Sequence, residues 1–150
     1  MNKQNVTFTC RIDGTDQTEQ RTATMGYCYA TEIAYKDLSG QDVADFLTEA
    51  LPLIHDNKMP DIKKSIYAIL SCMIAYYESI GEDSPVKSTD LMNEATPLEI
   101  GTALGTFLSL RANFYHLPAG EPEDKAPVSD DKATVPGASA SGKRKGKAKN

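Results

Sequence analysis

Five side chains in this 150-residue sequence are of the types that most often bind zinc: Cys10, Cys28, Cys72, His55 and His116. No two cysteines form a CxxC pair, and neither histidine lies near a cysteine in the sequence. Because a zinc site needs about four such ligands at close spacings, we predict no metal site and no other cofactor. We interpret the cysteines as reduced side chains packed as small hydrophobic groups. A disulfide between Cys10 and Cys28 is the alternative if the segments that carry them pair as strands.

The sequence contains none of the common catalytic motifs, such as GxSxG, HExxH or a glycine-rich phosphate-binding loop. His55 and His116 each fall at the end of a predicted helix, where an imidazole commonly interacts with terminal carbonyl groups. Adjacent acids such as Glu82 and Asp83 lie in a predicted loop, where solvent surrounds them. We therefore predict that the protein is not an enzyme.

The tyrosines are more informative about function, because tyrosine is favoured on surfaces that become buried only in a complex. Such side chains can also be ordinary members of a core edge. We predict a protein-binding surface on the exposed part of the helices, formed by Tyr76, Tyr77, Leu108, Phe114 and Tyr115.

Residues 142–150 form a basic tip with the side chains Lys143, Arg144, Lys145, Lys147 and Lys149. The chain has 16 basic and 21 acidic side chains, so without these five the remainder has 11 basic against 21 acidic. A basic tip can neutralise nucleic-acid phosphates, and a nucleic-acid-associated accessory protein is therefore our alternative function. Because no aromatic residue is interleaved and the body is acidic, we expect that contact to be weak and salt-dependent.

The longest apolar segment spans residues 59–80 and predicts a central helix over about residues 60–80. Its apolar residues recur at steps of three and four in two adjacent rows, so the helix needs neighbours on two sides. Gly81 can close its carboxyl end. A preceding helix is predicted over about residues 40–54 with Ser39 as its N-cap, packed antiparallel to the central one. Pro52 should end or kink this helix near Ala50 or Leu51.

A third strong helix signal begins at Thr96, where Thr96, Pro97 and Glu99 form a capping box with proline at the first helical position. The helix should run over residues 97–115 with Leu98 among its core residues. Gly101 and Gly105 weaken a helix, and we expect them to permit close packing against the central helix. A short helix over residues 89–95 precedes it.

The amino-terminal segment predicts a β-hairpin over residues 6–35. Apolar and polar residues alternate in residues 6–13 and again in residues 25–35, which is the period of a half-buried strand. The polar residues 14–24 would form a long connection. Since a two-stranded ribbon is marginal alone, it must pack on helices, and self-association through its free edge is a further expectation.

Together these signals predict an α+β fold, mainly α, in which the hairpin packs on a small bundle of three to four helices within a single domain, residues 1–117. Residues 118–150 are rich in proline and charge without aromatics, which predicts a disordered tail. No segment has the roughly 18 apolar residues of a membrane span. The amino terminus lacks an export signal, so we expect a cytoplasmic protein.

Three segments resemble small proteins encoded in the tail-gene clusters of phages and prophages of the Bacteroides type. They are EIAYKDLSGQDVADFLTEALPLI at residues 32–54, MPDIKKSIYAILSCMIAYYES at residues 59–79 and LGTFLSLRANFYHLPAGEPEDK at residues 104–125. The family consists of tail assembly chaperones of long-tailed phages. The segment FYHLPAGEPEDK contributes most to the resemblance.

The resemblance implies a non-enzymatic role in viral morphogenesis. Tail assembly chaperones bind the apolar, helical tape measure protein and help recruit tail tube protein subunits around it. It also implies a location in the host cytoplasm and absence from the mature virion. The resemblance transfers no catalytic residue, because the family has no catalytic signature.

Overall fold

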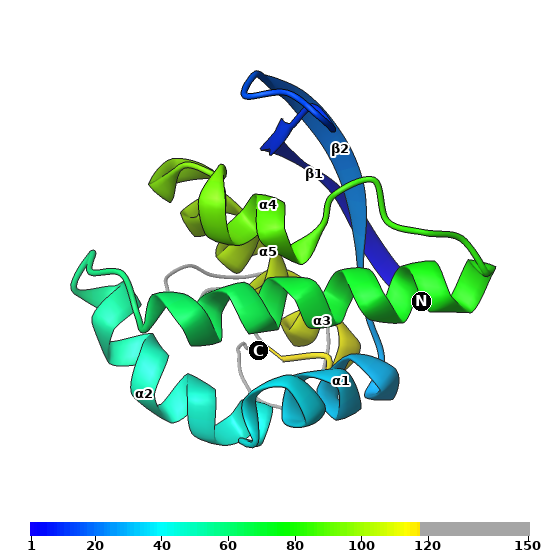
Figure 1. The fold of residues 1–150 in the computed structure, drawn as a ribbon. Coiled ribbons are helices and arrows are strands. Elements are labelled where there is room, and N and C mark those ends of the chain that lie inside the picture. Colours follow the sequence, from blue (N-terminus) through cyan, green and yellow to red (C-terminus); the bar gives the residue numbers. More distant parts are fainter. Residues whose placement is uncertain (118–150) are drawn as a thin grey trace, which may run out of the picture. The chain divides into compact units, whose positions relative to one another are not determined.

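The computed structural model describes residues 1–117, and the predicted tail 118–150 with its basic tip lies outside the described residues. Residues Met1–Phe114 form one compact unit, and a second unit begins at Tyr115. In the first unit an antiparallel hairpin packs against helices, so the α+β, mainly α fold class is confirmed (Figure 1). The elements are β1 (Asn2–Arg11), β2 (Thr18–Tyr27), α1 (Tyr29–Ser39), α2 (Val43–His55), α3 (Ile62–Ile80), α4 (Ser88–Asn93) and α5 (Pro97–Phe114).

The hairpin has one apolar face and one polar face, as its alternation dictates. The register runs from Asn2 opposite Tyr27 to Arg11 opposite Thr18. The inward side chains are buried: Val6, Phe8, Cys10, Ala23, Met25 and Tyr27. On the outward face, cross-strand pairs are joined by hydrogen bonds, including one of 2.9 Å between the hydroxyl groups of Thr7 and Thr22. The sheet therefore buries one face and leaves most of the other exposed to solvent, except near Gly26, which is buried.

The predicted second strand, residues 25–35, was wrong in position. The strand is β2, which occupies most of the segment predicted as a long connection, and only residues 12–17 join β1 to β2. Residues from Tyr29 onward form α1 instead. Thr31 and Tyr35 are buried and Tyr29 and Ile33 are exposed, which is the four-residue repeat of a helix rather than the two-residue repeat of a strand.

Thr31 explains why the chain turns from strand to helix at this point. Its hydroxyl group donates to the carbonyl oxygen of Gly26 at 3.0 Å and accepts from the N–H group of Cys28 at 3.1 Å. Thr31 is 0% exposed, so both backbone groups are satisfied inside the protein. The end of β2 and the start of α1 are thereby fixed by one side chain.

The central helix is α3, and α1 rather than the predicted α2 packs along it (Figure 1). Asp61 caps α3 by accepting from the N–H group of Lys64 at 3.0 Å. Gly81 closes it in the left-handed region with φ 69°, as predicted. α2 is linked to α3 by an ion pair of 2.9 Å between Glu49 and Lys64.

Two details of α2 differ from the prediction. The helix begins after Asp42, because Ser39 belongs to α1 and donates its hydroxyl group to the carbonyl oxygen of Tyr35. An end of the helix near Ala50 or Leu51 is also wrong, because α2 continues through Pro52 to His55, close to the predicted limit at residue 54. Pro52 and Thr48 are both exposed, so water can satisfy the Thr48 carbonyl group that proline leaves without a donor.

The capping box of α5 is present, with reciprocal bonds of 3.0 and 3.2 Å between Thr96 and Glu99. Two expectations for this helix were wrong. Leu98 is 79% exposed and does not join the core. A Cβ at Gly105 would have no atom within 4 Å, and one at Gly101 would meet only Met59 Cε at 3.9 Å, so neither glycine permits a close helix contact.

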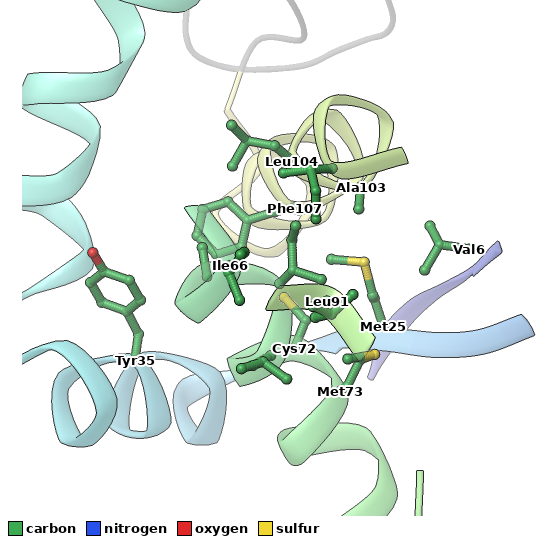
Figure 2. Close-up of a cluster of buried hydrophobic side chains, with 14 of the residues drawn as sticks. Val6, Met25, Tyr35, Ile66, Cys72, Met73, Leu91, Ala103, Leu104 and Phe107 are labelled. Carbon is green, nitrogen blue, oxygen red and sulfur yellow. The ribbon is translucent and has the colours of Figure 1, made fainter. Parts of the chain in front are cut away.

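The core lies where the inward face of the hairpin meets α3, α4 and α5 (Figure 2). Met25 of β2, Met73 of α3 and Leu91 of α4 gather there with Phe107 of α5. The Phe107 ring makes edge contacts with Tyr27 at 5.7 Å and Phe46 at 6.4 Å. This one aromatic side chain therefore ties the strand end to α2.

Candidate protein-binding surfaces

Tyr76 and Tyr77 are both half-buried near the carboxyl end of α3, with their rings in edge contact at 5.0 Å. The Tyr77 hydroxyl oxygen accepts from the N–H group of Thr24 at 3.0 Å, so this side chain covers part of the β2 edge. The Lys3 ammonium group lies 5.5 Å from the centre of the Tyr76 ring. Both tyrosines therefore have defined structural contacts, and their role in binding a partner stays a prediction.

Phe114 and Leu108 on α5 are half-buried against the core. The Phe114 ring lies 5.5 Å from Tyr27 and 5.0 Å from Tyr29. Tyr115 is 38% exposed and is the first residue of the second unit. The basic tip residues Lys143, Arg144, Lys145, Lys147 and Lys149 lie outside the described residues.

The predicted surface is divided between two faces of β2. A Cβ built on Gly26 would lie 3.2 Å from the Tyr76 Cβ atom, whereas the adjacent Tyr27 contacts Phe114. Consecutive residues of a strand point to opposite faces. Tyr76 and Phe114 are therefore on opposite sides of the strand end and do not form one continuous patch with each other.

The structure adds two exposed side chains that the predicted surface did not include: Tyr29, whose ring contacts Phe114, and Ile33, one helical turn further along α1. Tyr29 is 66% exposed and Ile33 is 62% exposed, and their spacing of four residues places both on one face of α1. With Phe114 they form what we call the Tyr29 patch. The signal was present as the i, i+4 spacing, but the same residues also fit the alternation of a strand.

Two carboxylates bind the edge of β1 that faces away from β2. Asp90 at the start of α4 accepts from the N–H groups of Arg11 at 3.0 Å and Lys87 at 2.9 Å. Glu99 in the first turn of α5 accepts from the Thr9 N–H group at 3.0 Å and from its hydroxyl group at 2.9 Å. We call Asp90 and Glu99 the carboxylate clamp.

The clamp residues are held in the ionised form. Burial opposes ionisation of Asp90, but the N–H groups of Lys87 and Arg11 and the charge of Arg21 outweigh it, so its pKa lies below the ordinary 3.8. Burial also opposes ionisation of Glu99, and the N–H groups of Thr9 and Thr96 lower its pKa from the ordinary 4.5. These acids are therefore structural anions rather than proton donors near neutral pH.

The thiols are free in the structure, with Cys10 and Cys72 buried and Cys28 half-buried. Cys10 faces the β2 residue Glu19 in the ladder and Cys28 precedes α1, so the strand pairing needed for the disulfide alternative does not exist. Burial, with the nearby Asp90 charge, raises the pKa of the Cys10 thiol to about 11. His55 ends α2 and is exposed.

Within residues 1–117, no cluster of three or more His, Cys, Asp or Glu side chains is arranged to hold a metal ion. The helices of this same part of the chain are all too short or too polar to span a bilayer.

Comparison of the chain with protein-family models, with curated proteins and with solved structures gives no match.

Proposed function

We propose that this chain is a non-enzymatic tail assembly chaperone that binds the tape measure protein and helps recruit tail tube subunits. The resemblance of residues 32–54, 59–79 and 104–125 to that family supports the class of function. The observation that carries the proposal is the Tyr29 patch, an exposed aromatic and aliphatic surface on a chain whose other rings are mostly packed.

The chemistry of the patch suits an apolar helix as its partner. Tyr29 and Ile33 lie on one helical face, and the Phe114 ring packs edge-on against Tyr29. A partner helix can bury these side chains by laying its own apolar face against them. Full burial of a large apolar side chain is worth about 1.5–3 kcal/mol. Tyr29 and Ile33 are each already partly buried, so loss of either side chain should weaken capture roughly tenfold.

The test is coexpression of the full chain with the gene for a tape measure protein of a long-tailed phage, followed by pull-down. Tyr29→Glu and Ile33→Glu should each reduce capture, because both place a charge on the patch. Leu98→Glu is the matched control: Leu98 is 79% exposed at the other end of α5 from Phe114. That separation is about 24 Å at 1.5 Å per residue. Circular dichroism and urea unfolding check that the variants fold.

The possible outcomes distinguish an error in the proposed function from an error in the proposed binding surface. Wild-type chain that fails to capture the tape measure protein overturns the proposed function. Capture that survives both patch substitutions, or that is lost in the Leu98→Glu control instead, overturns the Tyr29 patch as the binding surface. The alternative, nucleic-acid association through the basic tip, has no supporting observation in residues 1–117.

A further inference from the structure

The outer edge of β1 has a covered half and an open half. The carboxylate clamp accepts hydrogen bonds from the N–H groups of Thr9 and Arg11, and these N–H groups therefore point away from β2. Outward N–H groups recur at every second residue of an antiparallel strand, so those of Lys3, Asn5 and Thr7 point the same way. Within residues 1–117 these outward groups have no hydrogen-bond partner.

We propose that residues 3–7 of β1 pair in antiparallel fashion with the same residues of a second copy of the chain. A twofold axis at Asn5 places Lys3 opposite Thr7 of the second copy and Asn5 opposite its own equivalent. In this register every outward N–H and C=O group of the three residues meets a complementary group. The two hairpins then form one four-stranded sheet, independently of any binding at the Tyr29 patch.

The carboxylate clamp determines the direction of pairing. In a parallel arrangement in register, the clamp and the helices that carry it would lie directly opposite their copies and would collide. In the antiparallel arrangement, Thr9 of each copy lies opposite Met1 of the other, so each clamp lies past Asn2, the first residue of the other β1 strand. Shifting the twofold axis towards Thr7 would require the Thr9 N–H group, which Glu99 already occupies.

The side chains at the open edge are compatible with a second copy. No like charges face each other directly, because Lys3 is opposite threonine. Lysine on an edge strand usually discourages pairing. Here the Lys3 ammonium group reaches across the hairpin to the Tyr76 ring at 5.5 Å, and Tyr76 lies beside Gly26 of β2. The charge is therefore directed away from the open edge.

The pairing is tested by sedimentation velocity of the full chain from about 1 μM to about 1 mM, because so short a strand gives a small, weak interface. The wild-type chain should shift from monomer to dimer across this range. Asn5→Pro removes the central outward N–H group without touching the β1–β2 ladder and should raise the dissociation constant at least tenfold. Asn5→Ala keeps that N–H group and should dimerise like the wild type.

Gln20→Pro is the matched control on the opposite edge, since Gln20 faces Thr9 and its N–H group also points away from the ladder. It should dimerise normally. Association lost in Gln20→Pro but kept in folded Asn5→Pro would assign the interface to β2 and overturn the proposal. A wild-type chain that stays monomeric to about 1 mM would also overturn it.

Hydrogen exchange of the wild-type chain provides a measurement that does not depend on any variant. The amides of Lys3, Asn5 and Thr7 should exchange more slowly as protein concentration rises, whereas that of Thr22 on β2 should not change. Unchanged exchange at Asn5 in a dimeric sample refutes edge pairing. Added salt distinguishes this dimer from an association between the basic tip of one chain and the acidic body of another. Salt strongly weakens the tip–body association, because that one depends on charge, and weakens strand pairing much less.

Discussion

The carboxylate clamp predicts that Asp90→Asn will destabilise the protein far more than Glu99→Gln, although both changes replace an acid by its amide. Asp90 is 4% exposed, and each of its oxygens accepts from a different backbone N–H group. An asparagine offers one oxygen and one NH₂ group. Whichever way it is oriented, the NH₂ group faces the N–H group of either Arg11 or Lys87.

The expected cost follows from the number of donors left without an acceptor. Hydrogen bonds to a charged group are worth about 1.5–3 kcal/mol, and an unsatisfied buried donor costs a similar amount, so Asp90→Asn should lose about 2–4 kcal/mol. Glu99 differs because one oxygen accepts from both backbone N–H groups, of Thr9 and Thr96, and the other accepts from the Thr9 hydroxyl group. Glutamine can keep both N–H bonds with its amide oxygen, and the Thr9 hydroxyl oxygen can accept from the new NH₂ group instead of donating, so Glu99→Gln should lose about 1 kcal/mol.

The pH dependence gives the same comparison a second readout. The pKa of Asp90 is lower in the folded chain than its ordinary 3.8, so its contribution is complete above that value and is lost as pH falls through the folded pKa. At low pH the wild-type side chain is neutral, as asparagine always is. The stability difference between wild type and Asp90→Asn should therefore shrink below about pH 4.

Urea unfolding followed by circular dichroism measures these differences, with the midpoint expected to fall at unchanged slope. All other carboxylates titrate in both proteins, so the difference isolates Asp90. Exchange of the Arg11 amide should accelerate in Asp90→Asn. Equal stability of wild type and Asp90→Asn at neutral pH, or a difference that stays constant into acid, would refute the reasoning.

Three other predictions concern the strand end, the glycines and the thiols. Thr31→Val should cost about 1–3 kcal/mol in urea unfolding because two buried backbone groups lose their partner, and Thr31→Ser should cost less. Gly105→Ala should stabilise the protein by up to about 1 kcal/mol because the added Cβ meets open space. Gly26→Ala should destabilise it, because the added Cβ would displace the Met1 side chain and crowd the Tyr76 Cβ atom at 3.2 Å. Iodoacetamide near pH 8 should spare the buried Cys10, whose thiol pKa is about 11, until urea is added, as mass spectrometry would show.

The elements that depend on local signals could be predicted from the sequence. The alternation of Val6, Phe8 and Cys10 marks β1, and the left-handed Gly81 and the Thr96–Glu99 pair mark helix ends that the structure confirms. In each case the partners lie within a few residues of one another. Local hydrogen-bonding patterns therefore carry enough information to place them.

The region after Met25 was misassigned because one set of residues fits two periods. Tyr27, Tyr29, Thr31, Ile33 and Tyr35 alternate like a strand, yet Thr31 and Tyr35 also share a helical face. The Thr31 hydroxyl group resolves the ambiguity by binding the backbone of Cys28 and Gly26. A threonine three residues after a potential N-cap was the available signal.

The carboxylate clamp could not be predicted because its partners are distant in the sequence. Asp90 is 79 residues from Arg11, and Glu99 is 90 residues from Thr9. The acids at the starts of α4 and α5 are explained locally as first-turn residues that favour the helix dipole. Only the fold shows that the same carboxylates also bind the edge of β1.

The open edge of β1 and the Tyr29 patch share no residue, and this makes the two proposals separable. An Asn5→Pro chain should be monomeric with an intact patch, and a Tyr29→Glu chain should dimerise but capture a partner helix roughly tenfold more weakly. A dimer carries two copies of the patch, so capture of a long partner with repeated sites should gain avidity from edge pairing. Capture by the wild type should then rise more steeply with concentration than capture by Asn5→Pro, while a single-site partner peptide should bind both equally well.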